Sequence, residues 1–209
     1  MQRLWSLALL LTSVALAQMN TRVVWEPPNW DFPQDTKATI PKEMLSNLRV
    51  STVAVTLEET RLDKVVQLLG ATAGAKGDAG DSVQWLCFRG TDGGNQWVLW
   101  LESGEIDGGS VGSFQWQQLS TDAKGDLRCH VLSGTHPVEL AVPLKLGMAE
   151  ADVLKLLGKP SLRRSERMIY LHEHSESLSG VPYDSTNIIM IRIHEGLVTS
   201  IAVSKTTSS

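Results

Sequence analysis

Three histidines near the C-terminal end have side chains and a spacing that could bind a metal ion. His172 and His174 are two positions apart, so on a strand both imidazoles would point to the same side of the sheet. His194, from a neighbouring predicted strand, could act as a third zinc ligand, and bound zinc would support a hydrolase. No other residue stands at ligand spacing. We therefore predict solvated residues at a strand end and no bound metal.

Segments rich in glycine and acidic residues also fall short of a cofactor motif. Residues 77–81 and 92–95 have neither the length nor the ligand spacing of a calcium loop. The glycines between positions 70 and 80 lack the Gly-Lys-Ser/Thr ending of a phosphate-binding loop. We predict a protein without catalytic activity or cofactor. The alternative is an exported metal-dependent enzyme or hydrolase that uses the histidines.

The composition is that of an ordinary globular protein. Of the 209 residues, 42% are hydrophobic and 20% are charged, which excludes collagen-like, coiled-coil and largely disordered chains. The formal net charge is −4 at pH 7. Binding to nucleic acid or to an anionic membrane would need a basic surface, so we predict neither partner.

The N-terminal residues 1–17 have the pattern of a secretory signal peptide. Arg3 supplies a positive start, an apolar stretch follows, and Ala15 and Ala17 form a small-x-small cleavage site. The apolar stretch is shorter than the roughly 20 residues that a membrane-spanning helix needs. We expect an exported protein, periplasmic or secreted, whose mature chain begins at Gln18 and has no membrane anchor.

The two cysteines fit an exported protein. Cys87 and Cys129 each lie in an apolar run, and two cysteines in an oxidising compartment usually pair. We predict a disulfide bond between them. The alternative is a pair of unpaired buried thiols that act as small apolar side chains.

A segment rich in proline and tryptophan follows the signal peptide. Its prolines remove hydrogen-bond donors and block helix formation, so residues 18–50 are predicted to form an extended or irregular arm. We expect this arm to pack over the apolar surface of its own domain. The alternative is a peptide that docks on another protein.

The remainder of the chain contains a weak internal repeat. Apolar residues at helical spacing end in Leu-Leu-Gly at Gly70 and again at Gly158. Three strand-like runs follow each predicted helix, at residues 84–88, 96–101 and 113–119 and at residues 168–172, 187–194 and 197–204. The predicted fold class is therefore α+β, with two tandem units that each combine a helix with an antiparallel sheet.

These features predict six segments. They are a signal peptide (1–17), the arm (18–50), a first helix-sheet repeat (51–128), a bridge (129–145), a second helix-sheet repeat (146–204) and a short tail (205–209).

The second repeat resembles a known family. The run from Leu146-Gly147-Met148 through Val153 to Leu156-Leu157-Gly158-Lys159-Pro160, then Tyr170 and the Glu195-Gly196-Leu197-Val198 hairpin, is similar to the SmpA/OmlA small envelope protein domain. Its tandem duplication resembles the β-lactamase-inhibitor-protein fold. These families bind other proteins through sheet and loop surfaces, so the resemblance implies a protein partner. The chain lacks the lipidated cysteine of the envelope lipoproteins.

Side-chain alternation points to residues that could contact such a partner. Ile189, Ile191 and Ile193 form one apolar row that should face the core, which leaves Arg192 and His194 on the opposite side. The same reasoning predicts that four further residues face outward: Tyr170, His172, Trp85 and Trp100. In the alternative, the two tryptophans are core residues or are covered by the arm. We predict an exported, non-catalytic protein-binding module whose partner is another envelope or secreted protein. Such a module could act as an inhibitor or as an assembly factor. A small-ligand carrier is a further alternative.

Overall fold

The computed structural model describes residues 25–29, 32–33, 35–40, 42–78, 80–119, 128–134, 137–178 and 180–209. The predicted signal peptide, residues 1–17, lies outside these ranges. The described chain is rich in antiparallel strands and contains two α-helices of eight residues each. Its elements are β1 (Asn47–Val50), β2 (Val53–Thr56), α1 (Leu62–Leu69), β3 (Ala73–Lys76), β4 (Val83–Asp92), β5 (Asn95–Gly104), η1 (Glu105–Asp107), β6 (Ser113–Gln118), β7 (His130–Val131), β8 (Val138–Leu140), α2 (Glu150–Leu157), β9 (Leu162–Arg164), β10 (Arg167–Leu178), β11 (Val181–His194) and β12 (Leu197–Ser208).

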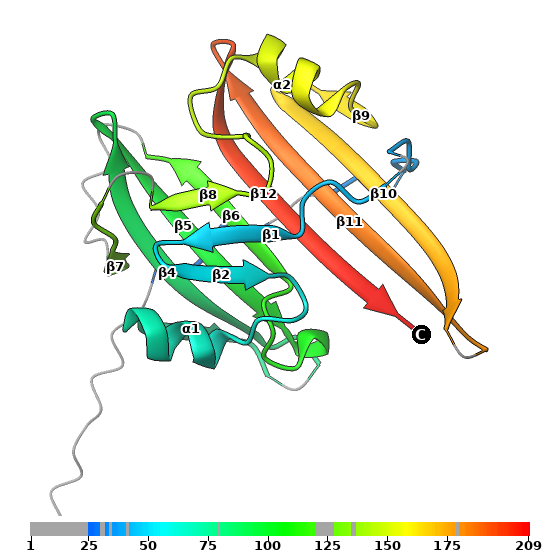
Figure 1. Cartoon of the computed structure of the whole chain (residues 1–209), viewed down its shortest axis with the longest axis horizontal. Helices are drawn as coiled ribbons and strands as arrows, with labels where there is room; N and C mark the ends of the chain where they lie inside the picture. The colour runs from blue at the N-terminus through cyan, green and yellow to red at the C-terminus, as the bar shows by residue number, and fades with distance from the viewer. Residues whose placement is uncertain are drawn as a thin grey trace, which may run out of the picture.

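One large sheet runs through the molecule. It has nine strands, in the order β3-β4-β5-β6-β12-β11-β10-β9, with β7 added in parallel beside β4. The strands of the main path pair antiparallel, and the arrows of β10, β11 and β12 point in alternating directions in Figure 1. Strands from both predicted repeats therefore belong to a single sheet.

The pairing of β6 with β12 corrects the predicted fold class. Trp116 lies opposite Ile201 and Phe114 lies opposite Val203, so the last strands of the two predicted repeats pair with each other. The α+β prediction of two separate helix-plus-sheet units is wrong, and the fold is β-rich. Both predicted helices and all six predicted strands exist, but edge-to-edge pairing merges them because an unpaired strand edge exposes backbone donors and acceptors.

The two faces of the large sheet are covered differently. A three-stranded sheet of order β2-β1-β8 lies over one face, here called the inner face, and both helices pack on that side (Figure 1). Val65 of α1 and Val153 of α2 are fully buried there against the strands, in the main hydrophobic core. The opposite face is called the outer face.

The hairpin between β10 and β11 extends beyond the core. Pairing continues to Leu178 and Val181, beyond the predicted strands 168–172 and 187–194. Most residues in this end of the hairpin are polar and exposed, so no row of apolar side chains packs there. Backbone hydrogen bonds between β10 and β11 hold this part of the hairpin together.

The described residues between positions 25 and 40, called the strap from here on, pass from the outer face to the inner face. The strap first crosses the tryptophans of β4 and β5. It rounds the edge of the sheet beyond β9, where the amides of Thr39 and Ile40 both donate to the carbonyl oxygen of Leu171. The chain then crosses in front of β10 and β11 to enter β1 (Figure 1). The described part of the predicted arm therefore packs on its own domain, as expected.

Candidate functional site

The outer face has an aromatic half on β4 and β5 and a charged half on β9, β10 and β11. In the aromatic half, Trp85, Cys87, Val98 and Trp100 are all buried in a hydrophobic cluster separate from the main core. Trp85 also lies over Gly74 of the edge strand β3, where a Cβ atom would come within 2.4 Å of the indole ring. Gly74 is therefore the residue that lets this ring lie flat on the sheet.

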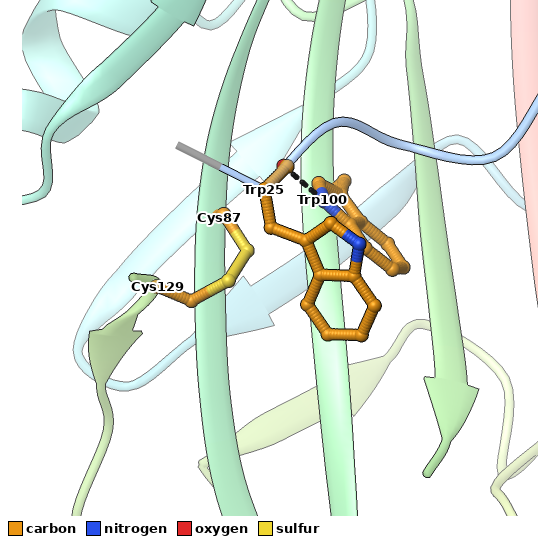
Figure 2. The surroundings of a disulfide bond; sticks show 4 residues. All are labelled: Trp25, Cys87, Trp100 and Cys129. Carbon is orange, nitrogen blue, oxygen red and sulfur yellow. Dashed lines mark hydrogen bonds between the residues drawn. A yellow bond between two sulfur atoms is a disulfide. The ribbon is translucent and has the colours of Figure 1, made fainter. Parts of the chain in front are cut away.

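A disulfide bond closes the edge of the aromatic half. Cys87 of β4 is bonded to Cys129, which precedes β7, and their Cα atoms are 4.7 Å apart (Figure 2). This confirms the predicted pairing. The bond closes a loop between residues 42 positions apart, which stabilises the fold by roughly 4 kcal/mol in the chain-entropy account. A disulfide in the core of a domain is typical of an oxidising compartment.

The strap covers the tryptophans. The ring of Trp25 contacts that of Trp100 edge to face, with centroids 5.2 Å apart, and the Trp100 indole N–H donates to the carbonyl oxygen of Trp25 at 2.9 Å (Figure 2). Trp85 and Trp100 are only 3% and 0% exposed to solvent. Both lie on the outer face, yet neither is available to a partner while the strap is in place.

A partly buried carboxyl group, that of Glu102, lies next to the strap. The Gln115 amide donates both to Glu102, at 2.9 Å, and to the carbonyl oxygen of Pro28, at 2.8 Å. Burial raises the pKa of Glu102 to about 7, although the Gln115 hydrogen bond and the positive charge of Lys76 act in the opposite direction. Lys76 is also paired with Glu26 of the strap.

The charged half carries a groove. The groove has a volume of about 450 Å³. Three arginines and one acidic residue are among its described lining residues, which are Pro33, Arg164, Ser165, Glu166, Arg167, Ile169 and Arg192. Asp35 of the strap pairs with Arg164 at 3.2 Å, and Glu166 pairs with the predicted site residue His194 at 2.8 Å. This contact with the Glu166 carboxylate raises the pKa of His194. Arg192 and His194 are thus brought close to one groove.

Two other predicted site residues face the core instead. The side chain of Tyr170 belongs to the main hydrophobic core, where its hydroxyl donates to the carbonyl oxygen of Gly158 at 3.2 Å. Burial raises the pKa of Tyr170 to about 12. His172 is 9% exposed, with Nδ1 3.0 Å from the carbonyl oxygen of Ile40. Their predicted outward orientation is wrong, because Tyr170 lies opposite Ile189 in the inward row.

The histidines do not assemble as a three-ligand zinc site would require. The rings of His172 and His174 are stacked with centroids 6.3 Å apart, but His172 lies opposite Asn187 in the middle of β11, whereas His194 is the last residue of that strand. Within the described ranges, no group of three or more His, Cys, Asp or Glu side chains is arranged to hold a metal ion. The third-ligand hypothesis for His194 is therefore wrong.

A serine motif that the sequence reasoning overlooked lies between η1 and β6. Gly108-Gly109-Ser110-Val111-Gly112 matches the Gly-x-Ser-x-Gly spacing of hydrolase nucleophile elbows. Such an elbow joins a strand to a following helix, whereas here a short 3-10 helix precedes the motif and a strand follows it. The structural context therefore does not favour a nucleophilic serine.

Comparison with family models, with curated proteins and with solved structures finds no match to this chain. The resemblance of the second repeat to the SmpA/OmlA domain thus stays a hypothesis. In the part of the chain that the structure describes, no helix combines the length and apolar character needed to cross a membrane.

Proposed function

We propose that this protein is an exported, non-catalytic binding module that holds an extended segment of another envelope or secreted protein on its outer face. The observation that carries the proposal is the strap itself. It binds this face without regular secondary structure, through carbonyl oxygens that accept hydrogen bonds from Trp100 and Gln115. A surface that holds one extended segment in this way suits a second one beside it, where Gln117 and Ser200 line a hollow next to Pro28 and Asn29 of the strap.

The location of the protein belongs to the same proposal. The Cys87–Cys129 disulfide and the predicted signal peptide both favour export to the periplasm or the medium. A partner would then be met in the same oxidising compartment.

A cross-linked pull-down from envelope and culture-medium extracts of the source organism tests this function. The parent chain is compared with a variant that carries Met190→Glu and Ser200→Glu, two partly exposed positions on the outer face. A matched control carries Lys64→Glu and Lys155→Glu, on the exposed sides of α1 and α2. Circular dichroism and thermal unfolding establish that each variant is folded.

The expected result is one protein captured by the parent and the control and lost with the outer-face variant. Capture that is lost only in the helix control would place the binding surface on the other side of the molecule. Absence of any specific protein would contradict the binding function.

A further inference from the structure

Three arginines of the charged half stand in one row across the sheet. Arg164, Arg167 and Arg192 occupy directly opposed positions on β9, β10 and β11. Opposed side chains on neighbouring strands have Cβ atoms about 5 Å apart, and like charges placed there destabilise a sheet. The row continues with the polar residues Ser200 on β12 and Gln117 on β6. The row gathers three guanidinium groups on one face of the sheet, and guanidinium groups are the donors best suited to an anionic group.

We infer that this arginine row and the groove beside it bind an extended acidic segment of the partner protein. The inference rests on the proposed function and specifies the chemistry of the partner. A guanidinium group is planar and can donate two parallel hydrogen bonds to a carboxylate, which gives both affinity and orientation. The strap supplies an example within the molecule, because the Asp35 carboxylate already pairs with Arg164.

The shape of the surface suits a chain better than a small anion. Arg167 and Arg192 line the groove and also a second, smaller hollow of about 70 Å³, so the two hollows meet at these side chains. The smaller hollow offers amide and hydroxyl groups from Asn29, Gln117 and Ser200. A segment that lies across β10, β11 and β12 would contact the arginines first and these hydrogen-bonding groups next.

The strap also restricts access to the row. Asp35 pairs with Arg164, and Pro33 forms part of the groove wall. An incoming carboxylate must therefore compete with Asp35 for Arg164. Removing the Asp35 charge should strengthen binding of an acidic segment by about threefold, the size expected for an exposed ion pair.

Fluorescence anisotropy with a labelled peptide of alternating Asp and Ser tests the inference, with the full exported chain as the protein. We expect Arg192→Ala to weaken binding about threefold and Arg164→Ala/Arg192→Ala about tenfold, the size expected for one and for two exposed ion pairs. Arg192→Lys should fall between the parent and Arg192→Ala, because it keeps the charge but not the planar fork. Arg49→Ala is the matched control, since Arg49 is an exposed arginine paired with Glu139 on the three-stranded sheet.

Several results would overturn the inference. They are equal binding of an Asn-Ser peptide of the same length, affinity that the groove variants leave unchanged, and inorganic phosphate that binds the arginines when the acidic peptide does not. A pull-down partner that depends on the outer face but is kept by Arg164→Ala/Arg192→Ala would refute this inference alone and leave the proposed function standing.

Discussion

The two halves of the outer face carry different side chains, and the chain itself covers them to different extents. Around the disulfide, Trp85 and Trp100 are sealed by Trp25 of the strap. At the other end, Arg192 stays exposed in an open groove although it stands on the same face of the same sheet. The strap thus buries the aromatic half and leaves Arg192 of the charged half exposed.

This difference separates residues that stabilise the fold from residues that can bind. Covering an indole removes a large apolar surface from water and favours folding, at roughly 25 cal/mol per Å². An arginine gains little from burial unless it is paired, so it costs little to leave one in water. Large aromatics are common in binding sites, but on this sheet the accessible binding groups are the arginines.

The largest expected difference between the halves is in stability. Trp100→Ala should lower the free energy of unfolding by about 4 kcal/mol, because it empties a fully buried site and removes the contact to Trp25. Arg192→Ala, in the open half, should change the free energy by less than about 0.5 kcal/mol. Urea unfolding of both variants under non-reducing conditions measures the two values. Similar losses would mean that the halves are not distinct.

Local features of the fold were within reach of the sequence. The Leu-Leu-Gly endings placed both helices, and Gly70 does adopt a left-handed conformation with φ of 71° at the end of α1. The disulfide followed from two cysteines in apolar runs of an exported chain. The inward row of β11 was also predicted correctly, since Ile189, Ile191 and Ile193 lie in the main core.

Pairing between distant strands was out of reach. Alternation gives the faces of a single strand but not its neighbours, so the β6–β12 pairing that joins the two repeats left no local signal. On β10 both rows are apolar, because Met168 and Tyr170 face the core while Ile169 and Leu171 are buried from the outer side. Periodicity could not decide between these faces, which is why the orientation of Tyr170 was predicted wrongly.

The candidate site was only partly predictable for the same reason. Arg192 was expected to face outward and does so, but Arg164 and Arg167 join it only through the register of β9, β10 and β11. In the sequence Arg192 is 25 positions from Arg167, and nothing in the spacing shows that the two side chains are opposed.

A second and smaller effect concerns the pH dependence of the strap-covered half. The pKa of Glu102 is about 7 in the folded protein, against 4.5 for an ordinary glutamate. Between these values the unfolded chain releases the proton and the folded chain keeps it, so stability falls as the pH rises from 4.5 to about 7 and the loss is complete above that.

Glu102→Gln should abolish this dependence, because the amide keeps the acceptor for Gln115 and cannot ionise. At pH 8 the variant should be more stable than the parent by about 2 kcal/mol, and at pH 4 the two should be equal within about 0.5 kcal/mol. Urea unfolding across this pH range, with the charged neighbours Lys76 and Glu26 left intact, gives the comparison. If the difference in stability between the parent and Glu102→Gln does not change between pH 4.5 and 7, the pKa of Glu102 is not raised in the folded protein.

The smallest expected effect lies in the charged half and has the opposite sign to that of Trp100→Ala. Because Arg192 stands directly opposite Arg167, Arg192→Gln relieves a like-charge contact and should raise the free energy of unfolding by about 0.5 kcal/mol at low salt. The gain should vanish in roughly 1 M salt, where the screening length is about 3 Å. Arg49→Gln removes an arginine that is paired with Glu139, so it should give no such gain. Thermal unfolding of both variants at the two salt concentrations makes the measurement. A loss of stability in Arg192→Gln would mean that Arg192 supports the fold, and the contrast between the two halves of the outer face would then disappear.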